Sequence, residues 1–236
     1  MSHMHIPDGV LPIWIVLIGW VATALILSFC IRRVSRIDIR RKVPLIGIVS
    51  ALMIVGMTLE IVPIAYHINL GVVAGIILGP ALAFISVFIV DLIIAMFGHG
   101  GITVVGLNTI VTGAEAVFGY YLFQLFLALL GKQSPGWASS LAVIVGLFLS
   151  TNVMLGIVYA SHIDPVKTFE AEHDIKDADH EDGVNRITNK GINFVRFAKT
   201  VFILAPLGWL LEAVITGLVI KYISRVRPDL IAVERT

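Results

Sequence analysis

Residues 69–97 read NLGVVAGIILGPALAFISVFIVDLIIAMF, an apolar run of 29 residues with a Gly79-Pro80 pair inside it. A helix needs about 20 apolar residues to cross a bilayer, so this run holds either one long tilted helix or two short spans. Proline lacks an amide hydrogen and clashes with the preceding helical turn, and a neighbouring glycine strengthens the break. We therefore predict two spans, one on each side of Pro80, with a single tilted helix as the alternative.

The composition of the whole chain is typical of a membrane protein. Of its 236 residues, 58% are hydrophobic and only 14% are charged, against about 25% charged residues in soluble domains. The other apolar runs of spanning length lie at 11–31, 44–64, 107–130, 138–160 and 200–222. A net charge of +1 provides no basic surface for nucleic acid, and the single cysteine excludes a disulfide scaffold and a cysteine-rich metal site. We predict an all-α integral membrane protein with about seven transmembrane helices in a single membrane domain, residues 1–236.

The positions of the charges predict the orientation of the chain. Six Lys or Arg residues lie in 32–42, directly after the first apolar run, and the positive-inside rule places such a segment in the cytoplasm. The N-terminus is then outside, and Lys221, Arg225 and Arg227 place the C-terminus in the cytoplasm. An outside start and an inside end require an odd number of crossings, which favours the split at Pro80. The polar segment 161–198 becomes an extracytoplasmic loop, either a solvated connection or, through its histidines, a metal-gathering antenna.

The first ten residues carry the groups of a metal chelate. They begin MSHMHIPDGV, with a Pro-Asp-Gly turn signal after the second histidine. A terminal amine, the next backbone amide and an imidazole can close two fused rings around one metal ion. One more imidazole would complete four nitrogens in a plane, an arrangement that favours Ni(II) or Cu(II). We expect segment 1–10 to be an extracytoplasmic metal-binding segment, the alternatives being a frayed terminus or a tag remnant.

Two further histidines are predicted to lie on the same face of the membrane. His67 follows the second apolar run, at the expected outer junction between spans, and His99 lies in a glycine-rich turn. Neutral imidazole is the commonest protein ligand for transition metals. Each has a plainer interpretation, since His67 can be an interfacial packing residue and His99 a loop residue that bonds backbone carbonyls.

At this point the sequence resembles the CbiM/NikM family, the substrate-capture subunits of energy-coupling-factor transporters for cobalt and nickel. The matching stretches are Met4-His5-Ile6-Pro7-Asp8-Gly9, Val43-Pro44-Leu45-Ile46-Gly47, Leu78-Gly79-Pro80, the stretch 100–108, and Glu212-Ala213-Val214-Ile215-Thr216. The resemblance covers nearly the whole chain except 161–195. It implies that Met4, His5 and His67 bind the metal, and that Asn108 lines the same pocket and orients a ligand. His99 occupies a turn where the family varies and ranks below His67.

The sequence departs from the family pattern at its start, because Met1, Ser2 and His3 precede the signature. Met4 has a free amine only if translation begins there or the first three residues are a remnant. In the remaining alternative the extension is native, and His3 supplies the chelate. We favour Met4 and His5, since Pro7-Asp8-Gly9 follows them at the family spacing.

The chain has no G-x-x-x-x-G-K-[ST] phosphate loop, so energy from ATP must come from partners. The resemblance implies a membrane coupling (T) subunit, a pair of ATP-binding cassette ATPase subunits and a small accessory membrane subunit. It also implies a multi-pass protein of a prokaryotic cell membrane that captures Co²⁺ or Ni²⁺ for uptake. We expect no resident cofactor and no enzymatic activity, because no H-E-x-x-H pair occurs on any span.

Four acidic residues lie in the apolar runs: Glu60, Asp91, Glu115 and Glu212. A carboxylate at mid-bilayer costs about 2.5–3.5 kcal/mol, so each must face protein or water. Glu60 lies two helical turns before His67 and is a candidate support for the metal pocket. We expect Asp91 and Glu115 to snorkel or cap near the ends of their spans, and Glu212 has no derived role. These acids also allow an alternative function, a stand-alone proton- or ion-coupled metal permease.

Overall fold

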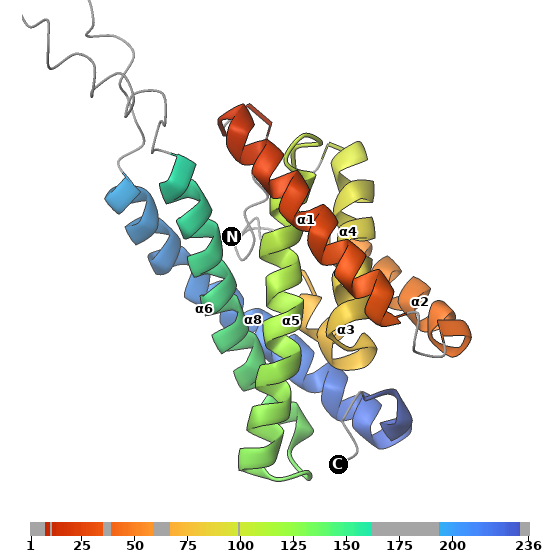
Figure 1. Ribbon diagram of the computed structural model, residues 1–236. Helices are drawn as coiled ribbons and strands as arrows, with labels where there is room; N and C mark the ends of the chain where they lie inside the picture. The colour runs from red at the N-terminus through yellow and green to blue at the C-terminus, as the bar shows by residue number, and fades with distance from the viewer. Residues whose placement is uncertain are drawn as a thin grey trace, which may run out of the picture.

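The computed structural model describes residues 8–9, 11–34, 39–58, 67–98, 100–161 and 194–231. Within these ranges the chain forms seven α-helices and one short 3₁₀ helix, which confirms the all-α prediction (Figure 1). The helices are α1 (Ile13–Val34), α2 (Ile39–Thr58), α3 (Gly71–Leu78), α4 (Pro80–Met96), α5 (Val105–Leu130), α6 (Pro135–Ser161), α8 (Phe194–Val226) and the 3₁₀ helix η2 (Pro228–Leu230). Most of the segment predicted as an extracytoplasmic loop, 162–193, lies outside the described residues.

The break at Gly79 is present, and a single tilted helix over 69–97 is therefore wrong. Gly79 has φ 81° and ψ 164°, a conformation that is open essentially to glycine alone. Its N–H donates to the Gly75 carbonyl at 2.9 Å, and its carbonyl accepts from the Ala83 N–H at 3.0 Å. Pro80 is the first residue of α4, a position where its missing N–H costs nothing.

The first of the two predicted spans is much shorter than a bilayer crossing. Helix α3 has eight residues, all of them buried, and is about 12 Å long. The residues before it, 67–70, are not helical. Non-helical backbone is tolerated at membrane depth only where protein or a water-filled cavity surrounds it, and Asn69 in this segment is 1% exposed.

Helix α5 is the centre of the bundle and contacts α1, α3, α4 and α6 (Figure 1). Small residues allow the close approaches. Gly75 of α3 packs directly on the Ala116 carbonyl, and Gly113 of α5 packs on the Phe84 ring of α4. Since Gly71 lies against Glu115 and Gly75 against residues 116–120, α3 runs in the same direction as α5. The polypeptide then turns back at Gly79 into α4.

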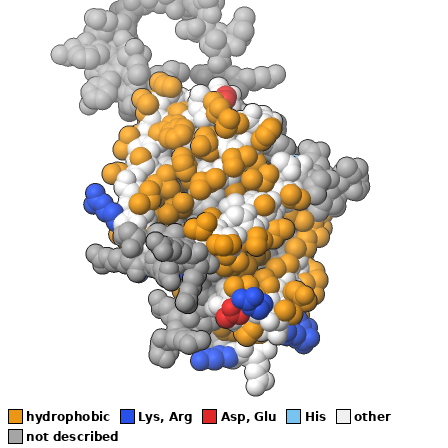
Figure 2. Space-filling view, turned by 90° about the vertical axis from the view of Figure 1, so that its right-hand side faces the viewer, with side chains coloured by type: hydrophobic (Ala, Val, Ile, Leu, Met, Phe, Trp, Pro, Cys, Tyr) orange, Lys and Arg blue, Asp and Glu red, His pale blue; other side chains and the backbone are white. Residues whose placement is uncertain are grey.

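The outside of the bundle is apolar, as a bilayer requires. Four helices are long and apolar enough to span: α1, α5, α6 and the Ala198–Val226 part of α8, whereas α4 and the apolar part of α2 are shorter. Large hydrophobic side chains are exposed on these helices, for example Leu25 at 67% and Leu129 at 71%. Figure 2 shows hydrophobic side chains over one face, with most of the coloured Lys and Arg side chains toward its lower end. The orientation in the membrane remains a prediction.

Candidate metal centre

The structure describes two of the seven residues predicted for the site, His67 and Asn108. The other five lie outside the described residues: His3, Met4, His5, Glu60 and His99. In the described part of the chain, no three His, Cys, Asp or Glu side chains gather as a metal site. The geometry of the site is therefore built from the segments that flank the predicted ligands.

The N-terminal turn is fixed to the loop before α5 through Asp8. Its carboxylate accepts hydrogen bonds from the N–H groups of Ile102 at 3.0 Å and Thr103 at 2.9 Å, and from the Thr103 hydroxyl. These bonds, the one from the Thr103 hydroxyl first, lower the pKa of Asp8 below its ordinary value. Gly101 packs against the Asp8 backbone and carboxylate, where any Cβ would collide. The Pro-Asp-Gly signal of the sequence is thus an anchor on residues 101–103.

That loop is in turn held by α1. The Trp20 indole N–H donates to the Thr103 carbonyl at 2.6 Å, and the Thr23 hydroxyl donates to the Gly106 carbonyl at 2.6 Å. A Cβ on Gly106 would lie 3.0 Å from the backbone of α1, so the two helices touch there. The N-terminal turn, the loop and the start of α5 consequently form one connected unit.

Asn108 belongs to this unit. It is the fourth residue of α5, its side chain is only 5% exposed, and its N–H donates to the Val104 carbonyl at 3.0 Å. The structure therefore brings Asn108 and the Asp8 anchor to the same end of α5. The pocket position that the family resemblance implies for Asn108 stays a prediction.

His67 begins the non-helical segment that leads into α3, and it is half-buried. The Ile68 N–H donates to the Gly56 carbonyl of α2 at 3.1 Å, and Gly56 packs on the Ile68 carbonyl where a larger residue would collide. The chain then turns into the bundle, because Asn69 is 1% exposed. His67 thus lies directly before a segment that enters the bundle.

Two glutamates from other helices hold that segment. We name the four residues of this contact the clamp: Asn69, Leu70, Glu115 and Glu212. The Asn69 side-chain amide donates to Glu115 at 2.8 Å, and the Leu70 N–H donates to Glu212 at 3.2 Å. Leu70 has φ 59° and ψ 19°, and it is the one non-glycine residue with positive φ among those described. Both glutamates are fully buried. Carboxylates from α5 and α8 therefore fix a strained backbone three residues after His67.

The expectation that Asp91 and Glu115 snorkel or cap is wrong. Glu115 is the eleventh of the 26 residues of α5 and has no exposed surface, and Asp91 of α4 is 2% exposed. The sequence alone predicts no role for Glu212 and does not single out Asn69. The available signal was Asn69 itself, a polar residue at the start of an apolar run that needs a buried partner.

Comparison with known proteins identifies the family of this chain. Residues 5–230 match the family described as cobalt uptake substrate-specific transmembrane region, CbiM. A Methanococcus voltae protein assigned to cobalt transport as CbiM is 26% identical over 238 residues, covering 96% of this chain and 94% of its own. The cobalt transport protein CbiM of Geobacter sulfurreducens is 31% identical over 131 residues, covering 51% of this chain and 37% of its own.

A solved structure shares the fold. The crystal structure of a truncated transition metal transporter superposes with a TM-score of 0.72 and covers 94% of this chain and 99% of its own, at 23% identity. The matched family spans the Asp8 anchor, the clamp and every described helix. The chain belongs to the CbiM family of cobalt uptake substrate-specific transmembrane components, which are multi-pass membrane transporters of prokaryotes and not enzymes.

Proposed function

We propose that this chain is the metal-capturing subunit of an energy-coupling-factor importer and binds one Co²⁺ or Ni²⁺ ion as its substrate. The ligands are the terminal amine of Met4, the amide and imidazole of His5, and the imidazole of His67. Asn108 orients a ligand from the first turns of α5. His99, His3 and Glu60 are further candidates for the surroundings of the ion.

The observation that carries this proposal is the Asp8 anchor. Asp8 is fixed by three hydrogen bonds to residues 102 and 103, at the end of α5 that also holds Asn108. The covalent chain keeps His5, three residues earlier, within about 10 Å of Asp8. The anchor therefore restricts the chelating residues to the surroundings of this helix end, which reduces the entropy that metal binding would otherwise cost.

The clamp supports the second half of the site. A histidine ligand must be held in one orientation to contribute to a planar set of nitrogens. His67 is followed by a backbone that Glu115 and Glu212 fix from two different helices. Since these acids hold the backbone, they also provide less support for a stand-alone proton-coupled permease, the alternative that the intramembrane acids first suggested.

We also propose that partner subunits couple transport to ATP. The sequence has no phosphate-binding loop of its own, so we infer that a membrane coupling subunit, two ATP-binding cassette subunits and a small accessory membrane subunit complete the importer. Cells that express this chain with those partners should accumulate cobalt or nickel. Uptake by this chain alone would instead support the permease.

The metal site is tested by titrating the purified chain with Ni²⁺ and with Co²⁺ and measuring bound metal. One ion per chain is expected, His67→Ala should reduce the affinity at least tenfold, and acetylation of the N-terminus should abolish binding. His173→Ala is the matched control, because it removes a histidine of the polar segment and should leave the affinity unchanged. Undiminished binding by the His67 variant would remove His67 from the site. Intact-mass analysis of the same sample identifies the residue that carries the free amine.

A further inference from the structure

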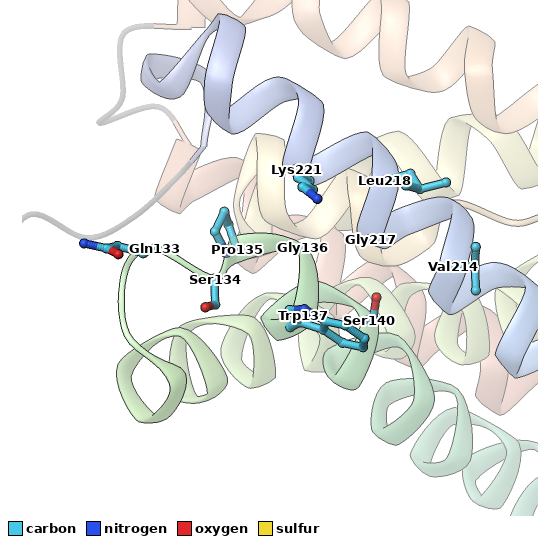
Figure 3. Close-up of a pocket in the computed structure, with 10 residues that line it drawn as sticks. All are labelled: Gln133, Ser134, Pro135, Gly136, Trp137, Ser140, Val214, Gly217, Leu218 and Lys221. Carbon is cyan, nitrogen blue, oxygen red and sulfur yellow. The ribbon is translucent and has the colours of Figure 1, made fainter.

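A cavity of about 420 Å³ opens between the start of α6 and the C-terminal half of α8, far along the sequence from the metal-binding segments. Figure 3 shows Val214, Leu218 and Lys221 spaced along α8, opposite Trp137 and Ser140 of α6. None of these residues takes part in the Asp8 anchor or the clamp. The cavity has no role in metal capture as proposed above.

The cavity exists because two helix backbones cross there in direct contact. The Ser140 hydroxyl donates to the Ala213 carbonyl at 2.8 Å, and a Cβ on Gly136 would lie 3.0 Å from the Gly217 carbonyl and 3.1 Å from Cβ of Lys221. Because Gly136 and Gly217 lie at the crossing, the larger side chains of the lining lie on either side of it. The space between them is the cavity, and the Lys221 side chain begins directly over Gly136.

The lining changes from apolar to cationic along α8. Val214, Leu218 and Lys221 are separated by four and three residues and so share one face of the helix. Val214 is 58% exposed and Leu218 is 63% exposed, as expected for side chains that face lipid. Lys221 follows where the tail turns basic, and Trp137 beside it is 74% exposed. Exposed tryptophan and lysine side chains are typical of the level of lipid headgroups.

We propose that this cavity binds the headgroup of one anionic phospholipid. The phosphate lies at the Lys221 ammonium, and an acyl chain follows Leu218 and Val214 into the bilayer. The volume suits a phosphate with its glycerol, within the usual size range of small-molecule sites. In the described part of the chain no ion pair involves Lys221, so its charge is available to an anion. The predicted orientation puts this end of α8 in the cytoplasmic leaflet, whose negative surface potential attracts basic residues.

The test uses the purified full chain and native mass spectrometry with added phosphatidylglycerol or phosphatidylcholine. One phosphatidylglycerol per chain should be retained and phosphatidylcholine should not. Lys221→Met keeps the stem over Gly136 and removes only the charge, so it should lower the retained phosphatidylglycerol at least fivefold. Lys221→Arg should restore retention. Arg225→Gln, which removes a nearby cation outside the cavity lining, is the matched control and should behave as the parent.

Four results of the mass-spectrometry experiment would overturn the proposal. They are equal retention by the parent and Lys221→Met, an equal loss in Lys221→Met and Arg225→Gln, equal retention of phosphatidylcholine, and displacement of the lipid by millimolar inorganic phosphate, which would indicate a site for free phosphate. A photoactivatable phosphatidylglycerol that labels the acyl-chain position gives a second readout. It should label a peptide containing Leu218 in the parent, and labelling spread evenly over the exposed helices would contradict a defined site.

Discussion

Helix α3 has an irregular backbone at each end, and different kinds of hydrogen bond hold the two ends. At its C-terminus Gly79 has φ 81° and ψ 164°, and its hydrogen bonds go to Gly75 and Ala83, at most four residues away. At its N-terminus Leu70 has φ 59°, and the bonds that hold the segment come from residues 46 and 142 positions away in the sequence. The first turn is encoded locally and the second is imposed by tertiary contacts.

The Gly79 turn only connects two helices, whereas the backbone at Leu70 lies next to the predicted metal ligand His67. Gly79 adopts its backbone without strain, because glycine has no Cβ, and Pro80 is well placed at the start of a helix. Leu70 adopts a left-handed conformation that costs about 1–2 kcal/mol for a residue with a Cβ. Strain of this kind persists where the surroundings over-determine the backbone, and it is concentrated at functional sites. The strained end is the one that follows His67.

Among the substitutions that test this comparison, the removal of the Glu115 side chain should reduce stability most. Glu115→Ala leaves the buried Asn69 amide without its Glu115 acceptor and creates a cavity, which together should cost about 3 kcal/mol. For a chain of this size that corresponds to a melting temperature roughly 10 °C lower in detergent. Glu115→Gln is the matched control, because it keeps the volume and an acceptor oxygen and should lose about 1 kcal/mol. A melting temperature for Glu115→Ala within 1 °C of the parent would show that the clamp does not hold the segment.

Substituting Gly79 tests the local end of α3. Gly79→Ala should destabilise the protein by about 2 kcal/mol through the backbone alone, since an added Cβ meets nothing within 4 Å. Gly47→Ala is the matched control: its Cβ also meets nothing within 4 Å, but it lies inside α2, where alanine is better than glycine by about 1 kcal/mol. Thermal melts should therefore move in opposite directions. Nickel affinity should be unchanged in both variants, and a large loss in Gly79→Ala would connect the turn to the site.

Features of this protein that depend on local sequence could be predicted, and features that depend on tertiary contacts could not. The seven helices and the break before Pro80 were predictable, because apolar length and proline chemistry are local properties. The Asp8 turn was recognised as a turn, but its partners on residues 102 and 103 were not, since they lie 94 and 95 positions away. The burial of Glu115 was misjudged because its depth in α5 depends on which helices surround it. The family resemblance supplied the candidate ligands, and apolar periodicity alone would not have selected His67.

Glu212 allows a finer test of the strained end. Glu212→Gln keeps the side-chain volume and an acceptor for the Leu70 N–H, but it replaces one carboxyl oxygen with an NH2 group at a fully buried position. We expect a loss of about 1 kcal/mol, the contribution of a typical intramolecular hydrogen bond, and a several-fold weaker affinity for nickel. Thermal melting and metal titration on the same sample measure both. Glu212→Ala should be worse in both measurements, and a Gln variant that equals the Ala variant would mean that the acceptor is not what matters.

The smallest expected effect is at Leu70 itself, and it separates strain from packing. Leu70→Gly removes the left-handed strain of about 1–2 kcal/mol. The glycine also loses about 0.5–1 kcal/mol to unfolded-state entropy and forfeits part of the packing of a partly buried side chain. These effects nearly cancel, so the melting temperature should move by no more than about 3 °C. The Leu70 N–H remains available to Glu212, and nickel affinity should therefore stay close to that of the parent. A large loss of stability with unchanged nickel affinity would show that Leu70 acts mainly through core packing. A loss of nickel affinity at unchanged stability would show that the Leu70 side chain, rather than Glu115 and Glu212, sets the direction of the chain after His67.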